Sequence, residues 1–355
     1  MSSPRVTAVI TSYNYGQFIA QAVESVLAQD FPAADLEVVV VDDGSTDDTP
    51  ERVKQFGDRI VYIRKPNGGQ ASALNAGFAN ARGEIVALLD ADDVWLPGKL
   101  RRVMEAFDRQ PDAVLVQHTR LQWYTETGTV LKDSDPPELS GAFPPLAVDL
   151  LSYGPNSTSA LAFRKSLLGE LLPIPETLGN LADSYLSALA VLKGPMIQIN
   201  EPLTKYRIHG KNLFSFDQAD EKRAVRRLAQ LQMLVAELER ELAARQQTYP
   251  GSGLDSYLMR FRLIESDLRF ATHGASRREF FRHLRLHDRV YGPLWSRRYK
   301  LFRGAMSVAG LLLGYRRFEA LRERYRRAGL QNRRDHWFPA EMGEAAPSPA
   351  QKALS

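Results

Sequence analysis

The chain has 355 residues, 44% of them hydrophobic and 25% charged, which suits a globular protein with one large domain and a smaller one. It contains no cysteine, so disulfides, thiolate metal sites and a cysteine nucleophile are excluded, and a reducing compartment is favoured. The formal net charge is +4, but residues 276–335 alone carry 17 Lys/Arg and 5 Asp/Glu, so the remainder of the chain is acidic. This asymmetry favours an anionic partner for the basic part.

The first residues lack the basic start and the long apolar run of a signal peptide. An apolar stretch at Ala305–Tyr315 would span only about half of a bilayer core as a helix. We therefore expect a cytoplasmic protein without a transmembrane segment.

Strand and helix patterns alternate through the first part of the chain. Short apolar, β-branched runs of the kind buried on both faces of a sheet occur at Val6–Ile10, Leu36–Val41, Ile60–Arg64 and Glu84–Leu89. Helical patterns lie between them at Phe18–Gln29 and Gln70–Ala81, and Thr49-Pro50 can open a further helix. This alternation predicts an α/β fold with a mostly parallel sheet.

Beyond Asp112 the pattern is mixed, with a strand expected at Ala113–Gln117 and a loop at Asp133–Pro145. From Asp220 onward helix formers dominate. A stripe of about two heptads is formed there by Leu228, Leu231, Val235, Leu238 and Leu242. A helix packed on its own chain is the simpler interpretation of this stripe, and a homodimer seam is the alternative. The residues after Glu341 are typical of a disordered tail.

Polar loops follow the ends of the four predicted strands. TSYNYG follows the first strand, DDGSTDD the second and DADD the fourth. Because the carboxyl ends of parallel strands form the ligand crevice of such a sheet, we expect these loops to converge. Asn67-Gly68-Gly69-Gln70 follows the third strand, and its glycines and the next helix N-terminus suit an anion.

The carboxylates of these loops suit a hard divalent cation. Asp90 and Asp92 can place one carboxylate on Mg²⁺ or Mn²⁺ and one on a sugar, although a solvated acidic turn is the alternative. Asp42 and Asp43 lie along the same edge, and so many carboxylates repel one another unless a cation offsets them. A diphosphate bridged by a metal would satisfy both the acidic and the glycine-rich loops. The sequence has no P-loop and no dinucleotide-binding glycine motif.

Four segments, TSYNYGQFI, VVVVDDGSTDDT, NGGQASALNAG and EIVALLDADDVWLP, resemble the family 2 glycosyltransferases in order and spacing. The match runs from Val6 to about Pro97 and less tightly to Asn212. It implies an α/β fold of the GT-A type, a Rossmann-like, mostly parallel sheet flanked by helices, with a helical C-terminal region. We expect a transferase domain at 1–217 (nucleotide-sugar binding at 1–110, acceptor side at 111–217), a helical basic region at 218–340 and a tail at 341–355.

The resemblance also implies roles for single residues. The donor is expected to contact Thr11, Tyr13, Asn14, Asp43, Asn67, Gly69, Gln70, Asn75, Asp90 and Arg207. The Mn²⁺ or Mg²⁺ cofactor is expected on Asp92, with Asp90 and His209 as further ligands, although a lone histidine is more often structural.

Asp183 matches the catalytic base of the family's ED motif, but Ala182 replaces the Glu of that motif. An inverting transfer needs such a base for the acceptor hydroxyl. A capping role at the local helix is the alternative for Asp183. The acceptor is expected to contact Trp95, which could equally belong to the core, and Ser159, which lies in the segment that matches the family's acceptor floor.

The implied reaction moves a hexose-type sugar from a nucleotide diphosphate donor, preferably a UDP-sugar, to a hydroxyl of a sugar or lipid-linked acceptor, with inversion. Its implied setting is the assembly of a cell-envelope polysaccharide or glycolipid. Because Ala182 leaves one motif incomplete, a non-catalytic nucleotide-sugar or carbohydrate-binding protein on the same fold is the alternative. A nucleotidyltransferase would need a glycine-rich basic loop after the first strand, and TSYNYG is not one.

The basic C-terminal region favours peripheral contact with the inner face of an anionic membrane. Ala305–Tyr315 is apolar and is flanked on both sides by arginines and lysines, with Trp295 and Tyr299 near its edge. Packing of Leu311–Leu313 on the catalytic domain is the alternative. A nucleic-acid partner is not expected, because the acidic catalytic half would oppose it.

Overall fold

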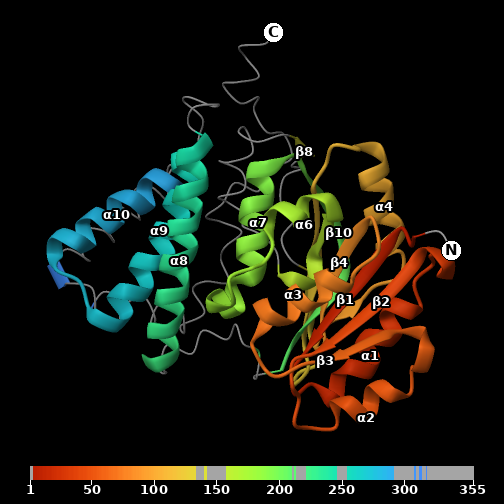
Figure 1. Ribbon diagram of the computed structural model, residues 1–355. Coiled ribbons are helices and arrows are strands. Elements are labelled where there is room, and N and C mark those ends of the chain that lie inside the picture. The colour runs from red at the N-terminus through yellow and green to blue at the C-terminus, as the bar shows by residue number, and fades with distance from the viewer. Residues whose placement is uncertain are drawn as a thin grey trace. The chain divides into compact units, whose positions relative to one another are not determined.

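The computed structural model describes residues 3–132, 140–141, 157–209, 212, 221–245 and 254–291, together with 308, 312, 313 and 317 (Figure 1). The chain divides into two compact units. Met1–Asp217 and Ala229–Tyr257 form the first unit, and Gln218–Leu228 and Leu258–Ser355 form the second. Most of the predicted loop at Asp133–Pro145, most of Ala305–Tyr315 and the tail after Glu341 lie outside the described residues.

The first half of the sheet is parallel, as the buried apolar runs predict. Its central strand is β1 (Val6–Ser12), which lies between β2 (Leu36–Asp42) and β4 (Ile85–Asp90), with β3 (Val61–Arg64) beyond β2. In the register of these strands, Ser12 lies opposite Asp42 and Thr11 opposite Asp90. The carboxyl ends of the strands are therefore level, so the loops that follow them open at one edge.

The second half of the sheet is mixed. Strand β9 (Leu161–Arg164) runs antiparallel to β4 and to β6 (Leu115–Tyr124), whereas β10 (Met196–Ile208) runs parallel to β6. Three short strands complete the sheet: β5 (Val94–Trp95), β7 (Val130–Lys132) and β8 (Ser140–Gly141). The main strand order is β3-β2-β1-β4-β9-β6-β10-β5. The predicted mostly parallel sheet is thus found in β3, β2, β1 and β4 and again in the β6–β10 pair, with antiparallel pairs in the second half.

Helices cover both faces of this sheet (Figure 1). On one face, α1 (Gly16–Leu27), α2 (Thr49–Lys54) and α4 (Lys99–Arg109) pack on alternate strand residues in one apolar core. On the other face, α3 (Gln70–Asn80) contacts β1, β2 and α7 (Ala182–Lys193). Gly77 of α3 permits this packing, because a Cβ there would lie 2.4 Å from a methyl carbon of Val9. Alternating side chains on each strand thus fill two cores.

Shorter helical elements connect these parts: η1 (Ala33–Asp35), η2 (Gly57–Arg59), η3 (Thr158–Ala160), α6 (Lys165–Leu171) and η4 (Glu176–Leu181). The later helices are α8 (Glu221–Arg245), α9 (Leu254–His273) and α10 (Arg277–Tyr291). Every residue of the predicted leucine stripe on α8 is buried within the chain. The stripe is therefore used in packing, and its interpretation as a homodimer seam is not supported. No helix within the described residues is both long and apolar enough to cross a membrane.

A buried carboxylate ties the start of the sheet together. Glu37 of β2 accepts hydrogen bonds from the Thr7 hydroxyl at 2.7 Å, the Arg82 backbone amide at 2.8 Å and the Arg82 side chain at 2.6 Å. Burial raises the pKa of Glu37, but the hydrogen bonds from Arg82 and Thr7 outweigh it, so the pKa is lowered overall.

We expect Glu37→Gln to lower the free energy of unfolding by about 2 kcal/mol at neutral pH, the usual worth of a hydrogen bond to a charged group. The contribution of a carboxylate with a lowered folded pKa is present above its unfolded pKa of about 4.3 and is lost as the pH falls through the folded pKa. Urea unfolding of both proteins at pH 7 and pH 3 measures this. Exposed Glu51→Gln is the control, and an undiminished difference at pH 3 would contradict the assignment.

Candidate active site

The polar loops that follow the first four strands meet at one edge of the sheet. Thr11 donates to Asp90 across 3.3 Å, and the Asn14 amide donates to the Ser45 hydroxyl across 2.9 Å. Gln70, at the start of α3, donates to the same oxygen of Asp90 across 3.3 Å. The convergence predicted from the strand ends is therefore confirmed by direct contacts.

Three acidic residues follow β4 within this edge. Asp92 and Asp93 are buried, and Asp90 is half-buried at the end of its strand. Burial, and then repulsion by Asp92 and Asp183, raise the pKa of Asp90 to about 7. Burial, and then repulsion by Asp92 and Asp90, also raise the pKa of Asp93 well above its ordinary value. The cluster is thus held at a cost in charge repulsion, which a bound cation would relieve.

His209, just after β10, faces the cluster. Its Nε2 lies 3.1 Å from Oδ2 of Asp92, and its ring packs against the rings of Tyr15 and Phe18, with centroid separations of 5.8 and 5.0 Å. Burial, followed by the carboxylates of Asp92 and Asp90, raises the pKa of the Tyr15 phenol, so this tyrosine stays protonated beside Asp92. The imidazole is therefore fixed in position next to the acidic loop.

These side chains fit a divalent cation that completes its coordination with a ligand. Among the described residues, no group of three or more acidic or histidine side chains is arranged around one metal position. Of the predicted ligands, Asp92 and His209 face each other, and the metal roles of Asp90, Asp92 and His209 stay predictions. Nδ1 of His209 is buried and finds no hydrogen-bond partner within the described part of the chain. Mg²⁺ commonly takes one or two carboxylates together with substrate phosphates and water, which such a pair can support.

Arg207 donates hydrogen bonds to the acidic loop. Its backbone amide donates to Asp93 at 2.9 Å, its Nε donates to the Asp92 carbonyl at 2.6 Å, and its guanidinium donates to Gln21 at 2.5 Å. The guanidinium carbon also lies 4.5 Å and 4.3 Å from the ring centroids of Phe18 and Trp123. Because it is buried and engaged in this way, Arg207 positions the loop. The predicted contact between Arg207 and the donor is corrected accordingly.

Asp183 is connected to Asp90 through two polar side chains. The Thr158 hydroxyl lies 3.5 Å from Oδ2 of Asp183 and accepts a hydrogen bond of 2.9 Å from Gln70, which also contacts Asp90. Burial raises the pKa of Asp183, against hydrogen bonds from Ser184 and Thr158 that lower it. Asp183 lies in the first turn of α7, and Leu181 is the residue at the cap position. Oδ1 of Asp183 accepts a hydrogen bond of 2.6 Å from the Ser184 backbone amide, which is a local helix contact.

The glycine-rich loop after β3 is closed on Asp43. Both oxygens of that carboxylate are engaged, by the Lys65 ammonium at 2.8 Å and by the amides of Gly68 and Gly69, the shortest of these at 2.7 Å. Asn67 donates to the Asp43 carbonyl at 3.0 Å. Gly69 has φ 84, a conformation that favours glycine, and precedes α3. The amides expected to face an anion therefore face Asp43.

The remaining predicted donor contacts are divided between the surface and the interior. The Tyr13 side chain is 46% exposed, and Asn14 adopts φ 56, an uncommon conformation for a non-glycine residue. Asn75 instead exchanges two hydrogen bonds of 2.8 Å with the backbone of Ile174. It therefore joins α3 to the segment before η4, and the predicted donor contact of Asn75 is not supported.

Neither predicted acceptor contact reaches the surface. Trp95 is 2% exposed and belongs to the core, which is the alternative that the sequence left open. Ser159 is also buried, and its hydroxyl accepts a hydrogen bond of 3.0 Å from the Asp90 amide. Its carbonyl accepts from Lys99 at 2.6 Å. These predictions are corrected: Trp95 is a packing residue and Ser159 positions the end of β4.

Comparison with known families agrees with this arrangement. The family described as glycosyl transferase family 2 matches residues 7–171. That range contains all four strand-end loops and ends with α6. Residues 7–171 of this chain thus match glycosyl transferase family 2, and the curated relatives support the assignment.

Relatives and solved structures point the same way. The chain is 36% identical over 218 residues to a Nostoc sp. protein described as an uncharacterized glycosyltransferase, covering 59% of this chain and 66% of that relative, just under two thirds. S. aureus TarS 1–349 in complex with UDP has a TM-score of 0.52 at 18% identity, covering 80% of this chain and 86% of that chain. The Pyrobaculum calidifontis mannosyltransferase PcManGT, in complex with GDP-Man and Mn²⁺, has a TM-score of 0.53 at 20% identity, with coverage of 90% and 84%. These structures show that the fold is GT-A.

Three residues that support the family's acidic loop were not predicted from the sequence. Tyr15 contacts Asp92, Thr158 links Gln70 to Asp183, and Lys99 is buried beneath the loop with its ammonium 4.2 Å from the Trp95 ring centroid. Burial lowers the pKa of Lys99 well below its ordinary value, although Asp93 opposes this. A signal for Lys99 was available, because it occupies a position in the apolar stripe of α4.

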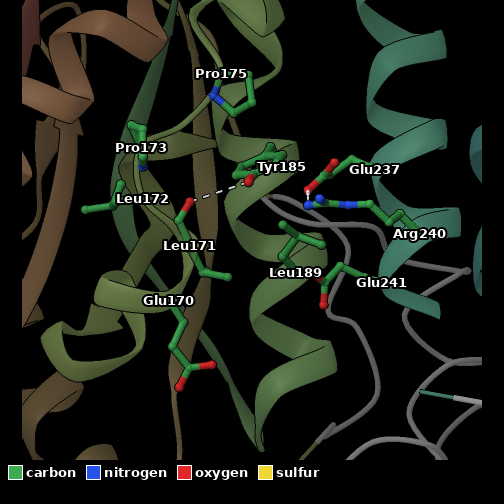
Figure 2. Close-up of a pocket in the computed structure, with 10 residues that line it drawn as sticks. All are labelled: Glu170, Leu171, Leu172, Pro173, Pro175, Tyr185, Leu189, Glu237, Arg240 and Glu241. Carbon is green, nitrogen blue, oxygen red and sulfur yellow. Dashed lines mark hydrogen bonds and ion pairs between the residues drawn. The ribbon is translucent and has the colours of Figure 1, made fainter. Parts of the chain in front are cut away.

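A hollow lies apart from the acidic cluster (Figure 2). It has a volume of about 320 Å³ and is lined by α6, the following proline segment, α7 and α8. Tyr185 and Leu189 face it, and on a helix these residues lie on the opposite side from Asp183. Its charges are paired: Arg240 contacts Glu237, and Lys193 lies 3.5 Å from both Glu170 and Glu241. The hollow therefore lies against the side of α7 that is opposite Asp183.

Proposed function

We propose that this protein transfers a sugar from a nucleoside diphosphate donor to an acceptor hydroxyl, with inversion at the anomeric carbon and with Mn²⁺ or Mg²⁺. The observation that carries the proposal is the meeting of four strand-end loops around Asp90, Asp92 and His209, with Asp183 joined to the same network through Thr158. The complexes of TarS with UDP and of PcManGT with GDP-Man and Mn²⁺, both on this fold, support a nucleotide donor here.

Each group in the network has a proposed task. Asp92 and His209 would hold the divalent ion, which supplies Lewis-acid stabilisation to the leaving diphosphate. Asp43 and the exposed Tyr13 would bind the nucleoside, and Asp90 and Gln70 the sugar. Asp183 would accept the proton of the attacking hydroxyl, and its raised pKa lies nearer the working pH of a general base than that of an exposed aspartate. Arg207 would hold the loop of Asp92 in place.

A panel of UDP- and GDP-sugars tests the proposal. We expect one donor to raise the unfolding temperature more with Mn²⁺ than without it, and to be hydrolysed slowly in a metal-dependent reaction. Proton NMR of the released sugar should show the anomeric configuration opposite to that of the donor. If no donor binds, the transferase proposal is wrong. If a donor binds but no acceptor mixture supports turnover, the non-catalytic binding protein suggested by Ala182 is favoured instead.

The proposed setting is the assembly of a polysaccharide or glycolipid from a sugar or lipid-linked acceptor. This rests on the family, and neither the acceptor nor the linkage follows from the geometry of the described residues. Polymers and lipid-linked sugars purified from the source cells are therefore the acceptors to add once the donor is known.

A further inference from the structure

One face of α10 is basic and exposed. Arg278, Phe281 and Arg285 are spaced by three and four residues, and Arg282 lies four residues after Arg278 and three before Arg285. This spacing places them on one side of the helix, and all four are exposed. Arg277 and Asp288 are exposed at the edges of this face. Among the side chains of α10 that the structure describes, this face therefore carries four arginines and one aspartate, with an aromatic ring between them.

Packing against α9 within the second unit fixes the direction of this face. Phe280 and Leu284, on the opposite side of α10, form a buried cluster with Phe270 of α9. His283 lies 3.0 Å from Asp267 and 2.7 Å from the Ser266 hydroxyl.

The start of α10 is fixed as well. The Ser276 amide donates to Glu279 at 2.9 Å, and Glu279 also pairs with Arg269 at 2.7 Å. Because one side of α10 is buried against α9, Arg278, Arg282 and Arg285 lie on the opposite, exposed side.

Apolar side chains are exposed in the same unit. Phe281 is 44% exposed, and its ring centroid lies 6.0 Å from the guanidinium carbon of Arg285. Within Ala305–Tyr315 the structure describes Val308, Leu312 and Leu313, which are 58%, 73% and 40% exposed. Apolar side chains among arginines are the composition that suits the headgroup region of a bilayer.

We propose that the exposed face of α10 docks on an anionic phospholipid surface. The arginines would contact lipid phosphates, and Phe281 would enter the acyl boundary. Charge complementarity carries the choice of partner, because residues 276–335 hold 17 basic and 5 acidic residues. Nucleic acid would also attract these arginines, but it offers no apolar phase for the exposed aliphatic side chains.

Flotation of the full chain with vesicles tests this proposal. The wild type should float with vesicles of equal parts phosphatidylglycerol and phosphatidylcholine at low salt, and should remain behind with phosphatidylcholine alone. The triple variant Arg278→Gln, Arg282→Gln, Arg285→Gln should bind on the order of 100-fold more weakly, since each basic residue near an anionic surface contributes about fivefold. Phe281→Ser should weaken binding about tenfold.

The matched control removes the same charge elsewhere. Arg52→Gln, Arg101→Gln, Arg109→Gln alters exposed arginines of the first unit and should float like the wild type. Donor binding by all variants should be unchanged, so a failed flotation is distinguishable from a failed transferase assignment. The proposal is overturned if the wild type does not float, if the two triple variants float equally, if neutral vesicles bind as well, or if duplex DNA binds more tightly than the anionic vesicles.

Discussion

Asp92→Asn is expected to reduce sugar transfer by at least about 10³-fold, because a metal Lewis acid is worth several kcal/mol and each 1.36 kcal/mol is a factor of ten in rate. The substitution removes a charged ligand but keeps the shape of the side chain. The Asp92 carboxylate lies 3.1 Å from His209, whereas the Asp92 backbone carbonyl accepts a hydrogen bond from Arg207. The loop should therefore keep its conformation in the variant. The loss of activity should therefore come from weakened metal binding.

Titration calorimetry of the nucleoside diphosphate separates this from a folding defect. Wild-type affinity should rise when Mn²⁺ is added, and affinity of the variant should not. Asp108→Asn is the matched control, because Asp108 is an exposed carboxylate on α4 that pairs with Arg5. Normal turnover with ordinary metal dependence in Asp92→Asn would remove Asp92 from the proposed site.

Asp183→Asn is expected to lower turnover by roughly 10²–10⁴-fold, the usual contribution of a general base, while donor affinity stays nearly unchanged. The variant keeps an amide oxygen that can accept from the Ser184 backbone, so the start of α7 should be preserved. A base is needed only when the acceptor hydroxyl is deprotonated, so the effect should appear in kcat and not in the dissociation constant of the donor.

Single-turnover kinetics with saturating donor measures this step. Ser184→Ala provides the control, because it removes a side-chain contact to the same carboxylate at 3.3 Å and leaves the carboxylate in place. Turnover of Asp183→Asn within a few-fold of the wild type would mean that Asp183 serves only the first turn of its helix.

The part of the site nearest the first four strands was predictable from the sequence. Buried β-branched runs with polar residues at their ends can form one parallel sheet, and level strand ends bring Thr11, Gln70 and Asp90 together. Those contacts follow from the local pattern and from one general property of parallel sheets. The contact between Asp92 and His209 could also be anticipated, but only through the resemblance, since His209 lies far along the chain from Asp92.

Errors in the prediction come from long-range packing that a single sequence does not reveal. Trp95 is buried because β5 pairs with β10, and Arg207 is buried because the same strand carries it beneath the acidic loop. Ser159 is a polar residue in a segment that looked like an acceptor floor, but η3 turns it toward the Asp90 amide. In each case a polar or aromatic residue near the site is buried and packs beside the acidic loop, so its side chain is not exposed to solvent.

The position of the metal is the most direct test of the central claim. Crystals of the intact chain soaked with a nucleoside diphosphate and Mn²⁺ would locate the ion by its anomalous scattering. We expect one peak about 2.0–2.2 Å from an oxygen of Asp92 and in contact with the diphosphate, with the nucleoside near Asp43 and Tyr13. A nucleotide bound at another edge of the sheet, or a peak that does not touch Asp92, would contradict it.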